Sequence, residues 1–261
     1  MIRRYVAALT PQAGGAQPSH SDAYAMYAAL LEAMGREAAE KLHDSADCSI
    51  SQYIVRLEGR AESLWTVNLV GAPAVEVVSP VIESMKSAEL RARGTTLSLE
   101  IISRNDAANL DAMLKIPGED MACGRFLLRF LSPCGFRSDN EYALFPSVPL
   151  ILGSLRRRWN AAFPFTPIDD SDAFAMLAAN VKITGYHLRG ASFKLKGVSI
   201  PSFSGTVTLS ARLSPPMLRL LRTLLSFGAF SGIGIKTALG MGGFEVKESP
   251  KPKVSYSCFT I

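Results

Sequence analysis

The sequence predicts an α+β protein with two antiparallel sheets, each covered by helices on one face. Residues 2–102 alternate between strand and helix patterns in the order strand, helix, strand, strand, helix, strand. Residues 124–248 fit a second, elaborated copy of that order, and the polar, proline-containing segment 103–120 lies between the halves. This order is that of a ferredoxin-like (RRM-like) unit. We therefore expect two such units in tandem, residues 1–118 and 119–261.

The composition is that of an ordinary folded chain. Its 261 residues are 48% hydrophobic and 20% charged, and the net charge of +5 permits a polyanionic partner without requiring one. The opening MIRRYVAALTPQAGG has only a short apolar run, and no later run reaches membrane-spanning length, so we expect a cytosolic protein with no membrane partner. The four cysteines lie far apart without a CxxC pair, which argues against a zinc site or a disulfide framework.

The first half contains two long helices and one short helix between its strands. The expected strands are residues 2–9, 48–57, 63–70 and 95–102. Met26, Leu30 and neighbouring apolar residues at helical spacing predict a helix that ends at Gly35, and a short second helix leads to His43. Pro73 opens the other long helix. Its expected inward side chains are Val77, Val78, Val81, Ile82 and Met85.

The second half repeats the pattern with longer connections. The expected strands are residues 124–131, 181–188, 191–200, 203–213 and 243–248, and the expected helices are residues 149–163, 171–179 and 215–227. The last helix has Ser214 as its N-cap, Pro215 at its first position and Gly228 just past its end.

A glycine-rich loop, GIGIKTALGMGG (residues 232–243), joins this last helix to the last strand. It is not a Walker A loop, because no glycine directly precedes Lys236, and Thr237 stands where the dinucleotide fingerprint needs glycine. Two interpretations stay open. The loop is either a tight connection that docks the two units, or a bare backbone whose N–H groups and Lys236 ammonium meet phosphate.

Several motifs together resemble a known family. FSGIGIKTALGMGGF (230–244), FSGTVTLSARL (203–213) and LSPCGFRSDNEYALFPSVPLILGSLRRRWN (131–160) are similar to the C-terminal half of CRISPR-associated endoribonucleases of the Cas6 family, in the RAMP superfamily. LLEAMGREAAEKLHDS (30–45) followed by SISQY (49–53) resembles that family's helix, short helix, histidine and strand. The resemblance is weakest over residues 60–120.

The resemblance implies a metal-independent endoribonuclease without a cofactor, which binds CRISPR repeat RNA and cleaves the precursor transcript once per repeat. His43 matches the catalytic histidine, which would assist attack of a 2′-OH on the adjacent phosphate. Tyr27 lies near a second catalytic position in uncertain register. No lysine follows His43 before Lys86, where some relatives place one. A helix-capping role is the plainer alternative for His43, and His20 and His187 are expected to be structural or exposed.

Basic residues and loop glycines are the expected RNA contacts. They are Lys236, Gly232, Gly234, Gly240, Gly242, Arg156, Arg157, Arg189, Lys194 and Lys196. At most two of the adjacent arginines 156–158 can face one groove, because neighbours on a helix lie about 100° apart, and a solvated helix face is the alternative role. We expect a monomer or a homodimer, with other CRISPR effector subunits as further partners. A non-catalytic RAMP subunit that holds guide RNA is the rival function, and an unrelated binding protein is the third.

Overall fold

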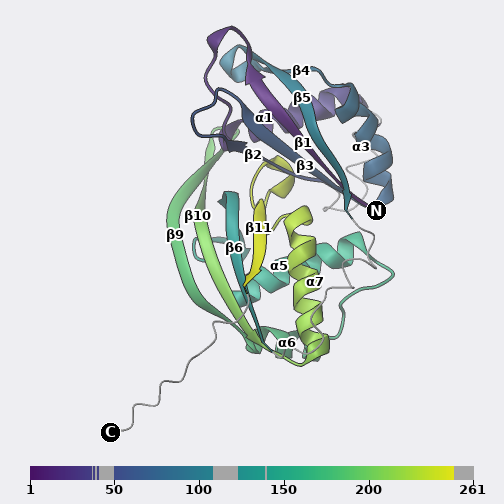
Figure 1. Cartoon of the computed structure of the whole chain (residues 1–261), viewed down its shortest axis with the longest axis vertical. Coiled ribbons are helices and arrows are strands. Elements are labelled where there is room, and N and C mark those ends of the chain that lie inside the picture. Colours follow the sequence, from purple (N-terminus) through teal and green to yellow (C-terminus); the bar gives the residue numbers. More distant parts are fainter. Residues whose placement is uncertain (37, 39, 41–49, 108–122, 139, 250–261) are drawn as a thin grey trace.

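The computed structural model describes residues 1–249 except 37, 39, 41–49, 108–122 and 139. Two antiparallel sheets lie one above the other, the first in the N-terminal half and the second in the C-terminal half of the chain (Figure 1). The α+β prediction and the tandem arrangement are confirmed. The predicted boundary near residue 118 lies outside the described residues and stays a prediction.

The N-terminal unit has the ferredoxin-like strand order with one added strand. Its elements are β1 (Ile2–Pro11), α1 (Ala23–Met34), β2 (Ile50–Arg56), β3 (Ser63–Val70), α3 (Ala72–Ser84), β4 (Ser87–Leu90) and β5 (Thr95–Ala107), with 3-10 turns η1 (Gln12–Gly14), η2 (His20–Asp22) and η3 (Arg91–Arg93). The sheet order is β2-β3-β1-β5-β4, in which β4 is an edge strand that the sequence pattern did not indicate. Gly35 ends α1 with a φ of 78°, as predicted.

Helices α1 and α3 cover one face of this sheet and enclose its core. Tyr5 and Trp65 are the largest side chains buried there. On α3, Val78 and Ile82 are buried as predicted, whereas Val77 is only half-buried. The helix is turned slightly from the predicted orientation. Its inward residues are Ala74, Val75, Val78 and Ile82, with Met85 just beyond its end, and Val81 is half-buried.

The C-terminal unit has the same topology. Its elements are β6 (Cys123–Cys134), β7 (Phe136–Ser138), β8 (Glu141–Ala143), α5 (Val148–Ala162), α6 (Ser171–Ala179), β9 (Val181–Leu195), β10 (Val198–Arg212), α7 (Pro215–Ser231), η4 (Thr237–Leu239) and β11 (Phe244–Ser249). The sheet order β11-β6-β10-β9 is again that of a ferredoxin-like unit. The β7–β8 hairpin is an insertion that the sequence pattern did not predict.

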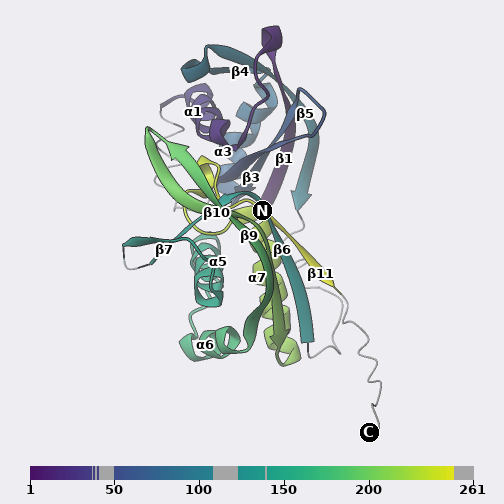
Figure 2. The ribbon, with the colours of Figure 1, turned by 90° about the vertical axis from the view of Figure 1, so that its left-hand side faces the viewer.

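One long hairpin replaces three predicted strands of this half. Residues 181–188, 191–200 and 203–213 form only β9 and β10, which turn at Lys196 and Gly197 with positive φ angles. The tip of this hairpin reaches the N-terminal unit, where the Lys196 ammonium lies 5.8 Å from the centre of the Tyr24 ring (Figure 2).

Helix α7 is longer than predicted, and Gly228 lies inside it rather than past its end. A Cβ at Gly228 would lie 2.4 Å from Cδ2 of Leu155 and 2.8 Å from Cζ of Phe244. This glycine therefore allows α7 to pack closely on α5 and β11. The true C-cap is Gly232, with a φ of 72°.

The end of α7 also connects the two units. Arg4 of β1 donates to the Ala229 carbonyl at 2.5 Å, and its guanidinium lies 4.4 Å from the centre of the Phe230 ring. Burial lowers the pKa of Arg4 from its usual value. Ser51 of β2 donates to the Phe230 carbonyl at 2.5 Å. None of the helices in the described residues is long and apolar enough to cross a membrane.

Candidate functional site

The glycine-rich loop lies where the two units meet, and protein acceptors take most of its backbone N–H groups. Ile233 donates to the Gly242 carbonyl at 2.9 Å, and Ile235 donates to the Gly135 carbonyl at 3.0 Å. The glycine N–H groups are also bonded: Gly232 to Gly228 O, Gly234 to Ser154 Oγ, Gly240 to Thr237 O, Gly242 to Pro133 O and Gly243 to Ser132 Oγ. These N–H groups are therefore already satisfied within the protein, contrary to the prediction that they meet phosphate.

Two of the glycines permit close contact with the N-terminal unit. A Cβ at Gly240, which has a φ of 115°, would lie 2.3 Å from Cβ of Ala23 in α1. A Cβ at Gly243 would lie 2.3 Å from Cδ1 of Tyr53 in β2. Gln52 of β2 adds a hydrogen bond to the Ala238 carbonyl at 3.1 Å. The geometry favours the docking interpretation of this loop.

Helix α5 holds the loop from the other side through Arg158. This side chain is buried, and it donates to the carbonyls of Ser231 at 3.2 Å and Gly234 at 2.9 Å. Arg156 and Arg157 point elsewhere, with Arg157 exposed and the Arg156 guanidinium 4.7 Å from the centre of the Phe174 ring. Arg158 therefore faces a different way from Arg156 and Arg157, which agrees with the prediction that at most two of the three arginines face one groove.

Lys236 is the cation that this loop presents to solvent. Its backbone has a φ of 55°, and its carbonyl accepts the N–H groups of Leu239 and Met241, so the peptide is fixed while the side chain stays exposed. None of the ion pairs found among the described residues includes Lys236. If the loop contacts phosphate, Lys236 is therefore the residue that we expect to make the contact.

The predicted catalytic residues are only partly described. His43 lies outside the described residues. Tyr27 is half-buried on α1, where burial raises the pKa of its phenol. His187 is exposed on β9, and His20 is half-buried in η2, where burial and the charge of Arg56 lower the pKa of its imidazole.

The open face of the C-terminal sheet, which the helices leave uncovered, is rich in cations. On β6, Arg125 and Arg129 alternate with buried Phe126 and Phe130, so the arginines point away from the core. The strand register then places other exposed charges on the same face. The basic sheet face, as we call it, consists of Arg125, Arg129, Lys182, Arg189 and Lys247, with His187 beside them.

One carboxylate offsets these charges among the described residues of this face. Glu245 of β11 pairs with Arg129 at 3.4 Å. Of the five cations, the sequence reasoning named only Arg189. The strand GRFLLRFL carried the missing signal, because its two arginines occupy alternate positions between apolar ones.

Two further predicted RNA contacts, Lys194 and Lys196, lie near the tip of the β9–β10 hairpin. Lys194 is exposed on β9, but Lys196 follows the end of that strand and has a φ of 48°. Although Lys194 and Lys196 stand two residues apart within the predicted strand 191–200, they do not share one strand, because the hairpin turns at Lys196.

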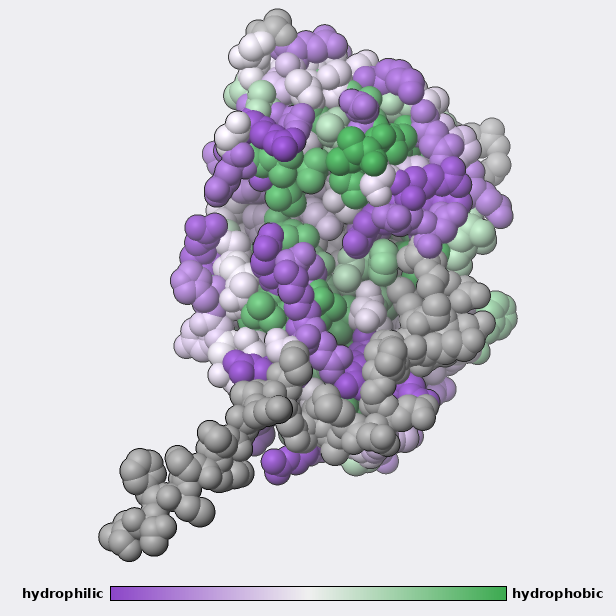
Figure 3. Space-filling model, in the orientation of Figure 1, coloured by the Kyte–Doolittle hydropathy of each residue, from purple (hydrophilic) through white to green (hydrophobic). Residues whose placement is uncertain are grey.

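The open face of the N-terminal sheet has the opposite chemistry. A cavity of about 480 Å³ on it is lined by apolar side chains together with Glu58, Glu62 and Glu100. Figure 3 shows a hydrophobic patch over β1 and β5 in the same region. Arg60, the one cation of this lining, pairs with Glu62 at 2.7 Å. A polyanion would meet carboxylates here, so the basic sheet face is the better surface for nucleic acid.

Comparison with known proteins agrees with this architecture. The family model of the CRISPR-associated endoribonuclease Cas6 matches residues 128–244, from β6 through the glycine-rich loop to the first residue of β11. A Cas6 endoribonuclease of Streptococcus thermophilus is 26% identical over 231 residues, which are 88% of this chain and 93% of that protein. The chain is thus similar to Cas6 endoribonucleases over most of its length.

Solved Cas6 structures share both units of the fold. A Cas6 product complex has a TM-score of 0.74 and 21% identity, and the match covers 95% of this chain and 100% of that one. Cas6 of Thermus thermophilus has a TM-score of 0.71 and 21% identity, covering 95% of this chain and 98% of that one. The Cas6 fold therefore extends over the N-terminal unit, where the sequence resemblance was weakest.

Proposed function

We propose that this chain is an endoribonuclease of the Cas6 family that binds CRISPR repeat RNA and cleaves the precursor transcript within each repeat. The Streptococcus thermophilus relative is an endoribonuclease by name, and a solved structure of similar fold is a product complex. The observation that carries the proposal for this chain is the basic sheet face. Lys and Arg side chains that neutralise phosphates supply most of the sequence-independent affinity of a protein for nucleic acid.

The proposed reaction uses the substrate's own 2′-OH. A base takes the 2′-OH proton, O2′ attacks the adjacent phosphorus, and the bond from phosphorus to the 5′-oxygen breaks. The 5′-oxygen leaves with a proton from an acid, so the products are a 2′,3′-cyclic phosphate and a 5′-OH end. Water and metal are not reactants in this step. A positioned acid or base accelerates such a step by about 10²–10⁴.

His43 is the proposed acid or base of this reaction. An unperturbed imidazole titrates near neutral pH, so it can give or take a proton under cellular conditions. Tyr27 is the proposed second group, as a hydrogen-bond donor to the phosphate. Its half-buried phenol with a raised pKa is expected to stay protonated, as that role requires.

A single RNA experiment tests the reaction and separates it from the rival function. Repeat RNA and the same RNA with one 2′-deoxy residue at the cut site are incubated with the protein in excess chelator. We expect cleavage of the first RNA, a 2′,3′-cyclic phosphate end, and no cleavage of the second. Cleavage that needs added magnesium would contradict the proposed chemistry. Tight binding without any cleavage would favour the non-catalytic RAMP subunit.

A further inference from the structure

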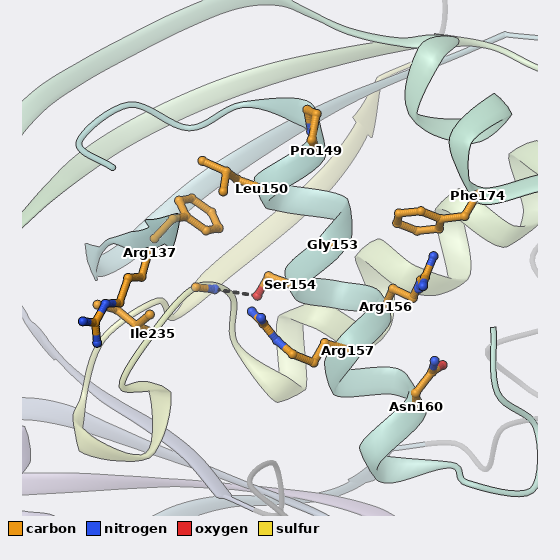
Figure 4. Close-up of a pocket in the computed structure, with 12 residues that line it drawn as sticks. Arg137, Pro149, Leu150, Gly153, Ser154, Arg156, Arg157, Asn160, Phe174 and Ile235 are labelled. Carbon is orange, nitrogen blue, oxygen red and sulfur yellow. Dashed lines mark hydrogen bonds between the residues drawn. The ribbon is translucent and has the colours of Figure 1, made fainter. Parts of the chain in front are cut away.

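A second basic site lies on the helix side of the C-terminal unit, away from the basic sheet face. A cavity of about 480 Å³ opens between β7, α5, α6 and the glycine-rich loop. Figure 4 shows Gly153 and Ser154 of α5 along its floor, with Ile235 of the loop on one side and Phe174 of α6 on the other. A cavity of this volume has the size of a small-molecule site.

Three arginines make the cavity positive. Arg137 reaches it from β7, and Arg156 and Arg157 reach it from α5 (Figure 4). Among the described residues, its lining contains no carboxylate, and none of these arginines takes part in an ion pair found there. The amide of Asn160, also in the lining, is already bonded at both ends to Ile168. The free hydrogen-bonding capacity of the cavity is therefore mainly that of the guanidinium groups.

The remaining walls are apolar and partly aromatic. Phe136 and Ile235 lie on the loop side, and Phe174 lies across the cavity with its ring 4.7 Å from the guanidinium carbon of Arg156. An apolar wall beside several arginines suits a ligand with a flat, uncharged part and an anionic part. A nucleotide has both parts, because its base stacks on rings or guanidinium planes and its phosphate pairs with arginine.

Gly153 supports a ligand at this place independently of the charges. Glycine is the least favourable residue after proline inside a helix, yet Gly153 stands in the middle of α5. No heavy atom lies within 4 Å of the position of an added Cβ, and its φ is not positive. Neither packing nor backbone conformation requires glycine here. A side chain at position 153 would occupy space in the cavity.

We propose that this cavity holds one unpaired nucleotide of the bound RNA, with the base over Gly153 and the flanking phosphates at Arg137 and Arg157. The inference rests on the proposed function, because it takes RNA as the ligand. Bases stacked within a duplex are not available to a cavity on a protein surface, so the nucleotide belongs to a loop, a bulge or an end.

Filling the cavity tests this inference. Gly153→Met projects a flexible side chain into the cavity, and Ala175→Met on the exposed side of α6 is the matched control. Gly153→Met is expected to melt no earlier than the parent, because methionine is a much better helix former than glycine, and Ala175→Met should melt close to the parent, because methionine ranks only slightly below alanine. RNA affinity is measured for the intact repeat and for a series with one abasic residue at each unpaired position in turn.

For the parent and for Ala175→Met, we expect one abasic position to weaken binding by about tenfold or more, the usual effect of losing a stacked base. For Gly153→Met, the intact RNA should bind about as weakly as that abasic RNA binds the parent, and the same abasic residue should cost nothing further. Such non-additivity is the mark of two groups in contact. Arg157→Gln, at an exposed position, repeats the measurement if Gly153→Met does not fold.

Additive penalties in both Gly153→Met and Arg157→Gln, or no penalty for the parent at any abasic position, would overturn the inference. These outcomes differ from failure of the proposed function. If the parent cleaves the repeat but the penalties are additive, the proposed nuclease function stands and the proposed nucleotide cavity is refuted. If the penalties are non-additive but the parent does not cleave, the proposed cavity stands and the proposed nuclease function is refuted. If the parent does not bind repeat RNA, both proposals are refuted.

Discussion

Removing two cations from the basic sheet face should reduce the salt dependence of RNA binding by a predictable amount. Lys182 and Arg189 are suitable because both are exposed on β9 and neither takes part in an ion pair found among the described residues. Arg189 donates one hydrogen bond to Ser204 at 3.1 Å. The double substitution Lys182→Ala, Arg189→Ala should therefore change stability by no more than about 0.5 kcal/mol per site.

The expected effect follows from counterion release. Each phosphate neutralised on a single strand contributes a slope of about −0.7 to a plot of log K against log salt concentration. If each side chain meets one phosphate, the double variant loses about 1.4 from the magnitude of the slope. Between 50 and 200 mM salt, a fourfold range, the binding constant of the double variant should therefore fall by a factor about sevenfold smaller than that of the parent.

The measurement is a titration of labelled repeat RNA at four or five salt concentrations, for the parent, the double variant and a control. Arg60→Ala, Arg104→Ala removes the same charge from the N-terminal unit, where both arginines pair with glutamates. Its slope should match that of the parent. An unchanged slope in the Lys182/Arg189 variant, or an equal change in the control, would refute the assignment of RNA to the basic sheet face.

Four further substitutions test other parts of the proposal. His43→Ala should lower the single-turnover cleavage rate by about 10²-fold or more with little change in affinity, and equal rates for variant and parent would remove His43 from the chemistry. Gly240→Val should destabilise the protein by about 2 kcal/mol or more, because it combines a clash with α1 and a φ of 115°; an unchanged melting temperature would contradict the docking role. Lys236→Ala should keep that temperature and reduce the salt slope by about 0.7, so a slope equal to the parent's would exclude a phosphate contact. Burial lowers the pKa of His20 in the folded state, so the unfolded state binds more protons at low pH. The free energy of unfolding should therefore fall as the pH drops through about 6.5. His20→Gln should make the melting temperature less dependent on pH between 7 and 5.

The sequence predicted the topology well because most elements carry their own periodic pattern. It failed where a contact from elsewhere in the chain overrides a local signal. Gly228 was taken as a helix end, but Leu155 and Phe244 pack against it and the helix continues. The predicted strands 191–200 and 203–213 left a gap at Pro201, but Pro201 lies within β10, where this section pairs only with β9, and an edge of a sheet tolerates proline.

The candidate site was harder to predict for the same reason. The composition of the glycine-rich loop is consistent with a phosphate cradle and with a docking loop, and only its hydrogen-bond partners decide between them. Ser132 and Ser154, which accept two of its N–H groups, lie far away in the sequence. The buried role of Arg158 depends likewise on where α7 ends. The Gly153 cavity could not be predicted, because its walls come from four separate segments.

The two units show that the fold alone does not make a surface for RNA. Each presents one open sheet face, and the residues at alternate strand positions decide what that face binds. In the C-terminal unit these positions carry Arg125, Lys182 and Arg189, whereas in the N-terminal unit Glu58 and Glu100 surround apolar side chains. A phosphate backbone that follows the first face would be repelled by carboxylates on the second. If the chain binds RNA as proposed, the charge difference between two similar sheets should keep the RNA off the open N-terminal face and direct it to the C-terminal unit, which carries the basic sheet face, Lys236 and the arginines of the Gly153 cavity. It leaves the N-terminal face to ligands of other chemistry.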